Sequence, residues 1–194
     1  MSPLSHATHS LVFDLDDTLY HTSDAVKRAY RQAGVVMPDG AQGRPWHEWL
    51  PTYLECSVQD AQFVHQRKND IYVDMIVSSE IEMTSAYSIF TRESDATVIT
   101  GASRPAALAL LAQNDHESRL ALSEASWRDK SYYLFSSSLE NAIYIDDNDQ
   151  LGRRIVREAN SLRGRHIEFE PFKFIHYVGQ STEELREQIE KCQS

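Results

Sequence analysis

The chain has only two cysteines, Cys56 and Cys192, which lie far apart and match no spacing typical of a zinc site or a redox pair. We therefore expect free thiols rather than a disulfide, as in a reducing compartment. No apolar run is long enough to cross a bilayer, because the longest are only the length of strands. The N-terminal segment lacks the basic region and the apolar core of a secretory signal. These absences predict a cytoplasmic protein with no membrane partner.

Basic clusters are also scarce. The formal net charge is −10, and no basic cluster is longer than Arg153-Arg154. Binding along a nucleic acid relies on many Lys and Arg contacts with phosphates, so this composition disfavours a nucleic-acid partner. Acidity does not exclude a phosphorylated ligand, because a bound metal ion and one lysine can reverse the field locally. We expect a small-molecule partner rather than a long polyanion.

Strands and helices alternate along most of the chain. Its 194 residues suffice for one large domain, or for a core with a smaller insert. The alternation predicts an α/β fold: a doubly wound, Rossmann-like parallel sheet with helices on both faces. After the first strand, which ends at residue 13, we expect strands at 96–100, 119–122, 141–145, 165–169 and 174–178. The intervening helices are expected at 103–113, 129–138, 150–160 and 181–192, the last with Ser181 and Glu184 spaced as a capping box.

Residues 21–92 interrupt this alternation with helical patterns alone. We expect helices at 24–33, capped by Ser23, at 58–77, and at 81–90 with Met83 facing inward. Prolines and glycines punctuate 35–57, which we expect to be irregular. The pattern predicts an inserted α-helical cap at 21–92 on an α/β core made of residues 1–20 and 93–194.

The most informative stretch runs from residue 11 to residue 20, with the sequence LVFDLDDTLY. Its apolar start reads as the end of a buried strand, and Asp14, Asp16 and Thr18 follow at a spacing of two. Asp is a poor strand residue, and a buried carboxylate is unfavourable unless it is paired or bound to a metal. One interpretation is a polar turn in which Asp16 or Asp17 caps a helix. The other is a nucleophilic Asp, a second carboxylate two residues later, and Mg²⁺ between them.

Other polar residues follow the later strands. Thr100-Gly101 ends the second expected strand, Asp146-Asp147 ends the one at 141–145, and Lys130 opens the helix before it. Ligands of an open parallel sheet bind beyond the carboxyl ends of its strands. Two carboxylate pairs, a hydroxyl and a cation at that edge together predict a phosphoryl-transfer site.

In order and spacing, these stretches resemble the four motifs of the haloacid dehalogenase (HAD) superfamily. Those motifs are DxDxT after a hydrophobic strand, a strand that ends in Thr or Ser, a Lys, and a strand that ends in acidic residues. The resemblance covers about 14–147, and outside the motifs only the rhythm of elements matches. FDLDDTLY and IDDND are similar to the motifs of the HAD pyrimidine 5'-nucleotidases. The resemblance implies a Mg²⁺-dependent phosphatase with a cap over its α/β core.

Each of these residues has an expected catalytic role. Asp14 would attack phosphorus and form an aspartyl-phosphate, and Asp16 would protonate the leaving oxygen and then take a proton from water. Lys130 would neutralise charge on the transferring group. The Thr100 hydroxyl and the backbone at Gly101, where the family often has Asn, would hold a phosphoryl oxygen.

The expected metal set is Asp14, Asp16, Asp146 and Asp147. Carboxylate oxygens are ligands that Mg²⁺ prefers. Asp146 would be the main acidic ligand, and Asp147 would bind a metal-bound water or hold the lysine. By resemblance, Asp16 contacts the metal through its backbone carbonyl. Asp149 is open to two interpretations, as an accessory acid or as the cap of the following helix.

Two basic residues near the motifs are each open to more than one interpretation. Arg128 is a rival to Lys130 as the cation, although Lys130 leaves room for a helix and a strand before Asp146. Arg104 could reach a substrate phosphate or lie in solvent at the start of its helix.

The cap segment is rich in aromatic residues. Trp46, Trp49 and Tyr53 stand among its prolines, with His47 and Glu48 between them. They either fill the small core of the cap or form a stacking wall for a nucleobase or another flat group.

The sequence therefore predicts a Mg²⁺-dependent phosphomonoester hydrolase for a small metabolite, with a nucleoside monophosphate as the leading candidate. A signalling receiver domain uses similar groups, but there the acidic pair precedes the phosphorylated Asp and no cap of this size is present. A catalytically silent HAD-like binding protein conflicts with the full set of catalytic groups. A polynucleotide-end phosphatase conflicts with the missing basic groove. The oligomeric state and the substrate stay open.

Overall fold

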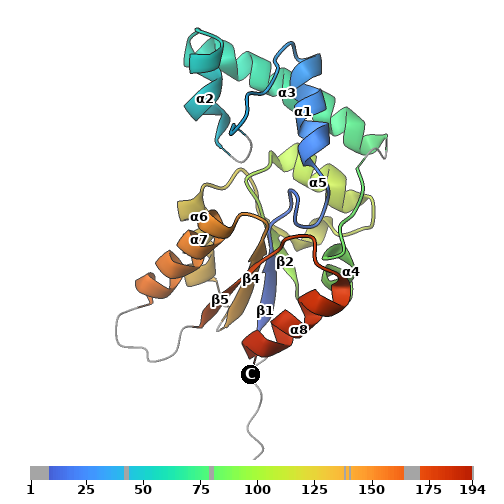
Figure 1. Cartoon of the computed structure of the whole chain (residues 1–194), viewed down its shortest axis with the longest axis vertical. Coiled ribbons are helices and arrows are strands. Elements are labelled where there is room, and N and C mark those ends of the chain that lie inside the picture. Colours follow the sequence, from blue (N-terminus) through green and yellow to red (C-terminus); the bar gives the residue numbers. More distant parts are fainter. Residues whose placement is uncertain are drawn as a thin grey trace, which may run out of the picture.

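The fold is built on a sheet of five parallel strands. The computed structural model describes residues 9–41, 44–78, 81–137, 139, 141–163 and 171–193. Its strands are β1 (Ser10–Phe13), β2 (Thr97–Ile99), β3 (Leu120–Leu122), β4 (Ala142–Asp146) and β5 (Phe172–His176). Their order in the sheet is β3-β2-β1-β4-β5, and every pairing is parallel (Figure 1). The α/β, doubly wound fold expected from the alternation is confirmed.

Helices cover both faces of this sheet, because alternate strand residues point to opposite sides. Phe13 and Ile145 belong to the apolar cluster that includes residues of α4 (Tyr87–Phe90), α5 (Arg104–Ala112) and α8 (Thr182–Gln193). Val12 and Tyr144 face the other cluster, with residues of α6 (Trp127–Ser136) and α7 (Asp149–Leu162). A short 3-10 helix, η1 (Glu117–Arg119), precedes β3. The described residues include no helix with the length and apolar character needed to span a membrane.

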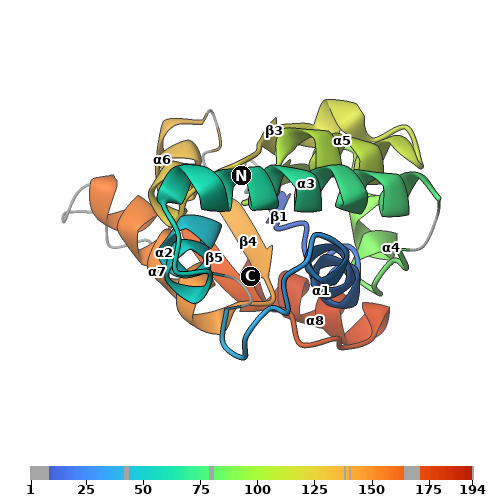
Figure 2. The same cartoon turned by 90° about the horizontal axis from the view of Figure 1, so that it is seen from above.

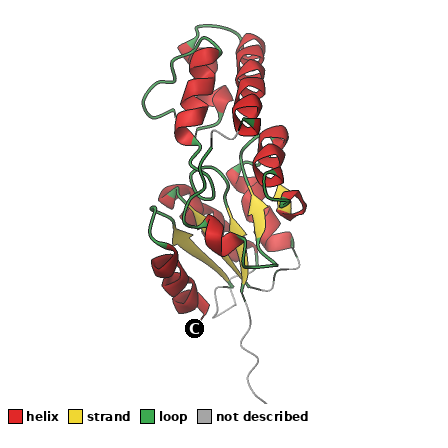
Figure 3. Ribbon diagram, turned by 90° about the vertical axis from the view of Figure 1, so that its right-hand side faces the viewer, coloured by secondary structure: helices red, strands yellow, loops and turns green. Residues whose placement is uncertain are grey.

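Three helices form a helical lobe: α1 (Ser23–Gln32), α2 (Trp46–Tyr53) and α3 (Val58–Val77). They share a small apolar cluster that includes Tyr30, Trp49, Leu50 and Ala61. One end of α3, with Tyr72 and Ile76, packs into the main apolar cluster of the core. Figures 1 and 3 show this lobe standing above the sheet, on the side where β1 and β4 end, and Figure 2 shows it from above. The lobe therefore faces the edge at which ligands of such sheets bind.

Two expectations for the insert were wrong. The stretch 35–57 contains α2, because Pro45 precedes the helix and Trp49 and Leu50 bury one side of it in the lobe. The helix expected at 81–90 is reduced to α4. Residues 81–84 instead lie along the loop after β1, where the Thr84 N–H donates to the Leu19 carbonyl at 2.9 Å, and Met83 is 49% exposed. Backbone pairing with that loop replaces the intrahelical hydrogen bonds.

The cap of α1 also differs from the expectation. Asp17, not Ser23, caps this helix: its carboxylate accepts from the N–H groups of Thr22 and Ser23, both at 3.0 Å. Asp17 has φ 54°, a left-handed conformation that Asp tolerates better than most residues. The capping interpretation thus applies to Asp17, which leaves Asp14 and Asp16 for other roles.

The C-terminal elements are partly as expected. The Ser181–Glu184 capping box is confirmed, with the Ser181 N–H donating to the Glu184 carboxylate at 2.9 Å and the Glu184 N–H donating back to Ser181 Oγ at 3.3 Å. The last strand begins two residues earlier than predicted. The strand expected at 165–169 lies outside the described residues.

The division into a cap at 21–92 and a core of the remaining residues stays a prediction. The last part of that insert contacts the core directly, since the rings of Phe90 and Phe13 pack edge to face with centroids 5.7 Å apart.

Candidate active site

The site forms where β1 and β4 end next to each other. Asp14 directly follows β1, and its N–H donates to the Ile145 carbonyl at 2.9 Å. Asp146 is the last residue of β4. In the sheet, the strand that follows β1 in sequence, β2, lies on one side of this pair, and the strand that follows β4, β5, lies on the other. The position between β1 and β4 is therefore the topological switch point, where doubly wound sheets bind ligands. The register therefore brings Asp14 and Asp146 side by side.

Lys130 reaches this pair from α6. Lys130 is 4% exposed, and its ammonium donates to Asp14 Oδ1 at 2.6 Å and lies 3.9 Å from Asp146 Oδ2. Arg128 is exposed and lies over the Trp127 ring, 5.1 Å from the ring centroid. Of the two candidates for the cation, the structure places Lys130 against the carboxylates and Arg128 away from them.

Tyr144 completes this group, and the sequence reasoning missed it. Its hydroxyl accepts from the Lys130 ammonium at 3.0 Å and donates to Asp146 Oδ2 at 2.5 Å. Burial and the carboxylates of Asp14 and Asp146 raise the pKa of Tyr144, so the phenol stays neutral and keeps its donor proton. A hydroxyl two residues before Asp146, on the same face of an otherwise apolar strand, was the signal that could have found it.

We predict that Tyr144→Phe weakens Mg²⁺ binding by about tenfold, since a hydrogen bond to a charged group contributes roughly 1.5–3 kcal/mol. Without the hydroxyl, Asp146 and Lys130 are held less firmly. Calorimetric titration with Mg²⁺ measures the change directly, and Tyr132→Phe on the exposed side of α6 is the matched control. Equal Mg²⁺ affinity in the Tyr144 variant and the wild type would contradict this role.

A second acidic loop is tied to the first by Thr18. The Asp147 N–H donates to Thr18 Oγ1 at 3.0 Å, and the Thr18 hydroxyl donates to Asp147 Oδ1 at 3.4 Å. Asp149, the other candidate accessory acid, is instead paired with Arg153 at 2.8 Å. Asp147 therefore joins the site, and Asp149 belongs to the first turn of α7.

The carboxylates of Asp14, Asp146 and Asp147 could hold a metal ion. Each offers one oxygen, and these oxygens lie within 4.8 Å of one another. Burial, with the charges of Asp146 and Asp16 adding to it, raises the pKa of Asp14 well above its ordinary value, although Lys130 opposes this. The oxygens of these three carboxylates are the kind of ligand that Mg²⁺ prefers, and Lys130 balances only part of their negative charge. The Asp16 side chain is not one of the three.

This crowding predicts a pH dependence of stability. Burial and the nearby Asp146 and Asp17 charges raise the pKa of Asp147 to about 7, above its ordinary 3.8. A carboxyl whose pKa is higher in the folded state stabilises the fold when protonated, so its contribution falls as pH rises from about 4 to about 7. Asp14 and Asp16 act in the same direction, because the pKa of each is also raised.

We therefore expect the metal-free protein to have a higher Tm at pH 5.5 than at pH 8. Mg²⁺ at pH 8 should restore most of the difference, and Asp147→Asn should shrink it. Thermal unfolding across this pH range, with chelator and with Mg²⁺, measures all three. A Tm of the chelated protein that is flat or rises with pH would contradict the expectation.

The Thr100-Gly101 pair lies at the end of β2, next to β1 in the sheet. Thr100 is buried, and its hydroxyl oxygen accepts from the Ala102 N–H at 3.0 Å. Gly101 is exposed, and a Cβ there would meet only the Ala125 carbonyl at 3.5 Å. Ser103 is the N-cap of α5, and its buried hydroxyl has no hydrogen-bond partner among the described residues. Arg104 is exposed in the first turn of that helix.

Asp16 lies between the carboxylate cluster and the helical lobe. Its Oδ1 is buried and makes no hydrogen bond within the described part of the chain. Burial raises the pKa of Asp16, while Thr22 and the charge of Lys68 in α3 act to lower it. A carboxyl with a raised pKa is suited to proton transfer.

The two tryptophans of the lobe have different surroundings. Trp49 is buried and packs edge to face on Tyr30, with ring centroids 5.2 Å apart. Trp46 is partly exposed and stacks on His65 at 5.0 Å. Trp49 thus fills the core of the lobe, in line with the first of the two interpretations of these aromatic residues.

Solved structures with a similar fold are HAD-superfamily hydrolases. A HAD hydrolase of family IA, variant 3, from Entamoeba histolytica aligns with a TM-score of 0.66 and 14% identity, covering 94% of this chain and 100% of that one. CbbY from Rhodobacter sphaeroides, in complex with xylulose-(1,5)-bisphosphate, aligns with a TM-score of 0.64 and 18% identity, covering 86% and 93%. A haloacid dehalogenase-like hydrolase from Streptococcus pneumoniae aligns with a TM-score of 0.59 and 15% identity, covering 93% and 90%.

By sequence, the chain matches no protein-family model and no curated protein. Identities below 20% establish a shared fold and leave the chemistry to be argued from the side chains. The chain has the fold of the HAD hydrolases, with the Asp14–Lys130–Asp146 cluster at the carboxyl edge of its sheet.

Proposed function

We propose that this protein is a Mg²⁺-dependent phosphomonoester hydrolase that transfers the phosphoryl group to Asp14. The observation that carries the proposal is the buried Lys130 ammonium, 2.6 Å from Asp14 and 3.9 Å from Asp146, at the switch point of the sheet. Attack of a carboxylate on a phosphate ester brings two anions together, so it requires positive charge at the reacting centre. Lys130 supplies one such charge.

A metal ion would supply the rest. Asp14, Asp146 and Asp147 would hold Mg²⁺ through their carboxylates, and the resemblance adds the backbone carbonyl of Asp16. When bound, Mg²⁺ neutralises phosphoryl oxygens and orients them for in-line attack.

The protein side chains would then act in two steps. In the first, an Asp14 oxygen bonds to phosphorus as the ester oxygen leaves, and that oxygen receives a proton from Asp16. In the second, a water oxygen bonds to phosphorus as the bond from phosphorus to Asp14 breaks, and the water gives up a proton to the Asp16 carboxylate. Lys130 neutralises the nucleophile and the transferring oxygens throughout. Thr100 and Gly101 would position the phosphoryl group from the end of β2.

Asp16→Asn should lower kcat by about 10²–10⁴-fold, the usual contribution of a positioned general acid and base. The amide cannot supply or accept the proton, but the three carboxylates of the metal cluster are unchanged. Steady-state kinetics on an ester with a poor leaving group give the rate, and Mg²⁺ titration checks the metal site. An unchanged kcat would remove Asp16 from the mechanism. Lost Mg²⁺ binding would assign it a structural role instead.

A panel of phosphate esters assayed with Mg²⁺ and with chelator tests the proposed function. Hydrolysis of p-nitrophenyl phosphate that requires Mg²⁺ would support it. Stable phosphorylation without release of phosphate would favour a receiver-like protein, and no reaction would favour a silent binding protein. The panel includes nucleoside monophosphates, because Trp46 keeps a partly exposed ring, and a phosphorylated oligonucleotide end. We further propose a cytoplasmic location and a cap role for residues 21–92.

A further inference from the structure

Lys68 is a buried cation that the proposed two-step chemistry does not use. It lies on α3 and is 8% exposed. Its ammonium sits 5.2 Å from the centroid of the Tyr30 ring and 5.1 Å from that of Tyr72, and it donates to Asn69 Oδ1 at 3.2 Å. No carboxylate in the described ranges lies within 4 Å of it. The nearest counter-charge is that of Asp16, which acts from beyond contact distance and opposes the effect of burial on the pKa of Lys68. A buried cation without a carboxylate in contact is incompletely compensated, which favours binding of an anion from outside the chain.

Two more polar groups in the same place lack partners. The Tyr72 side chain is 2% exposed, and its hydroxyl lies near Thr22 and Asp16 without a hydrogen bond of normal length and angle to any described residue. The same holds for Asp16 Oδ1, as noted above. Buried hydroxyls are almost always satisfied in folded proteins, so a hydroxyl without a well-formed hydrogen bond next to a buried ammonium indicates a ligand.

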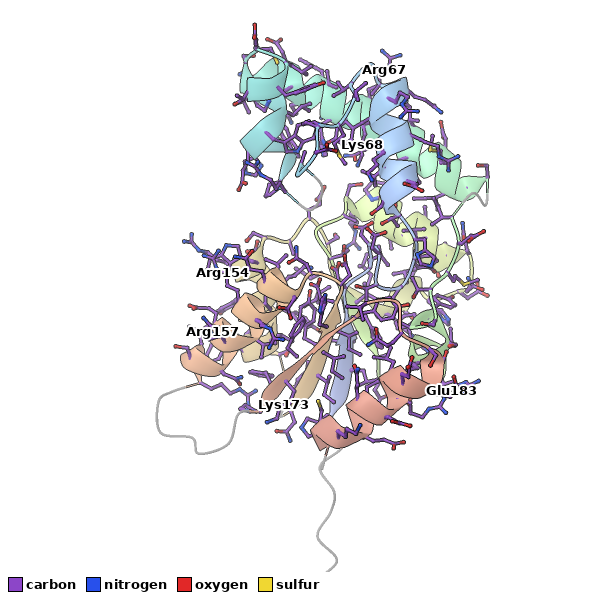
Figure 4. The ribbon with its side chains drawn as sticks, in the orientation of Figure 1. Arg67, Lys68, Arg154, Arg157, Lys173 and Glu183 are labelled. Atoms are coloured by element: carbon purple, nitrogen blue, oxygen red, sulfur yellow. The ribbon has the colours of Figure 1, made fainter. Side chains whose placement is uncertain are left out.

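These groups face the reacting centre. The Lys68 ammonium lies over the Tyr72 ring, 5.1 Å from its centroid, and the charge of Asp16 acts on both side chains, so the three lie near one another. Figure 4 shows Lys68 on the inner side of the lobe and Arg67, the preceding residue, on its outer side. Asp16 is the group expected at the leaving oxygen. Lys68 and Tyr72 therefore lie where the leaving part of a substrate would be.

We propose that Lys68 and Tyr72 bind a second anionic group on the leaving part of the substrate, so that the preferred substrates are short phosphomonoesters that also carry a carboxylate or a second phosphate. This inference rests on the proposed function. The ammonium and the hydroxyl both donate, which suits an oxyanion. The Tyr30 and Tyr72 rings hold the cation in place when the site is empty. The leaving part must be short, because Lys68 is close to Asp16.

The test compares three two-carbon phosphate esters that end in a hydroxyl, a carboxylate or a second phosphate, with p-nitrophenyl phosphate as a probe of the chemistry alone. The readout is the ratio of kcat/KM for a charged ester to kcat/KM for the hydroxyl ester. We expect the wild type to favour one charged ester, and which one it favours identifies the anion. Lys68→Gln should lower that ratio by about 30-fold or more, as when a buried ion pair loses one partner.

Arg67→Gln is the matched control, since it removes an exposed cation from the adjacent position of the same helix and should leave the ratio unchanged. Tyr72→Phe removes only the hydroxyl, and it decides the matter if Lys68→Gln does not fold: a lower ratio supports the proposal and an unchanged ratio overturns it. A wild type that hydrolyses p-nitrophenyl phosphate without preferring either charged ester overturns this inference alone. A wild type that hydrolyses no ester overturns the proposed function as well.

Discussion

Asp14→Asn is expected to lower kcat by about 10⁴-fold or more, the size of loss seen when a nucleophile is removed from an enzyme. An amide is a poor nucleophile and cannot form an aspartyl-phosphate. It also carries no charge for a metal ion or for Lys130, which donates to Asp14 at 2.6 Å in the native protein. Both losses affect the reacting centre, so their effects should appear in kcat rather than mainly in KM. Steady-state kinetics with p-nitrophenyl phosphate and Mg²⁺ measure the change.

Asp149→Asn is the matched control for this substitution. It also turns an Asp into Asn at the carboxyl edge of the sheet, but Asp149 pairs with Arg153 on the surface of α7 and not with the cluster. Its activity should stay within about twofold of the wild type, in line with the small contribution of a surface ion pair. Circular dichroism of both variants establishes that they are folded. Appreciable turnover by a folded Asp14→Asn protein would refute the nucleophile assignment.

Lys130→Met is expected to have the second largest effect, with kcat lower by about 10³-fold. Removing a positioned electrostatic donor from a buried site typically has effects of about 10²–10³-fold or larger. This cation also neutralises Asp14 and Asp146 in the resting protein. Its loss leaves the Asp14 carboxylate and the Tyr144 hydroxyl without their common donor, and Asp146 without the cation 3.9 Å away. The metal-free variant should therefore unfold about 3–5 kcal/mol more easily.

Two measurements separate these effects. Urea unfolding in chelator gives the loss of stability, and kinetics at saturating Mg²⁺ give the loss of turnover. Arg128→Met, two residues earlier on the exposed side of α6, is the control and should change neither quantity appreciably. If Arg128→Met were the more damaging substitution, the cation would have been assigned to the wrong residue.

The sheet and the meeting of the acidic loops could be predicted from the sequence because both depend on local rules. Alternating strands and helices imply parallel strands, and polar residues at strand ends then gather at one edge. Asp14, Lys130 and Asp146 are brought together in this way from positions up to 132 residues apart. Spacing alone could not separate Lys130 from Arg128. Lys130 is buried and Arg128 is exposed because of the orientation of α6 about its own axis, which depends on how the helix packs against α7.

What the sequence did not reveal depends on contacts between distant segments. Residues 81–84 have a helical pattern, but their backbone pairs with the loop after β1 instead. Tyr144 looks like an ordinary apolar strand residue until its hydroxyl is seen between Lys130 and Asp146. Lys68 repeats at helical spacing with apolar neighbours. Only the tertiary structure shows that it lies between two tyrosine rings and close to Asp16.

The most direct measurement of the central claim is to trap the phosphoryl group on the enzyme. The protein is quenched with acid during steady-state turnover of a phosphomonoester with Mg²⁺, digested, and mapped by mass spectrometry. The account predicts one phosphoryl group on the peptide that contains Asp14, and none when Asp14→Asn is treated in the same way. Full turnover with the label on another residue, or a labelled peptide in the Asp14→Asn protein, would contradict it.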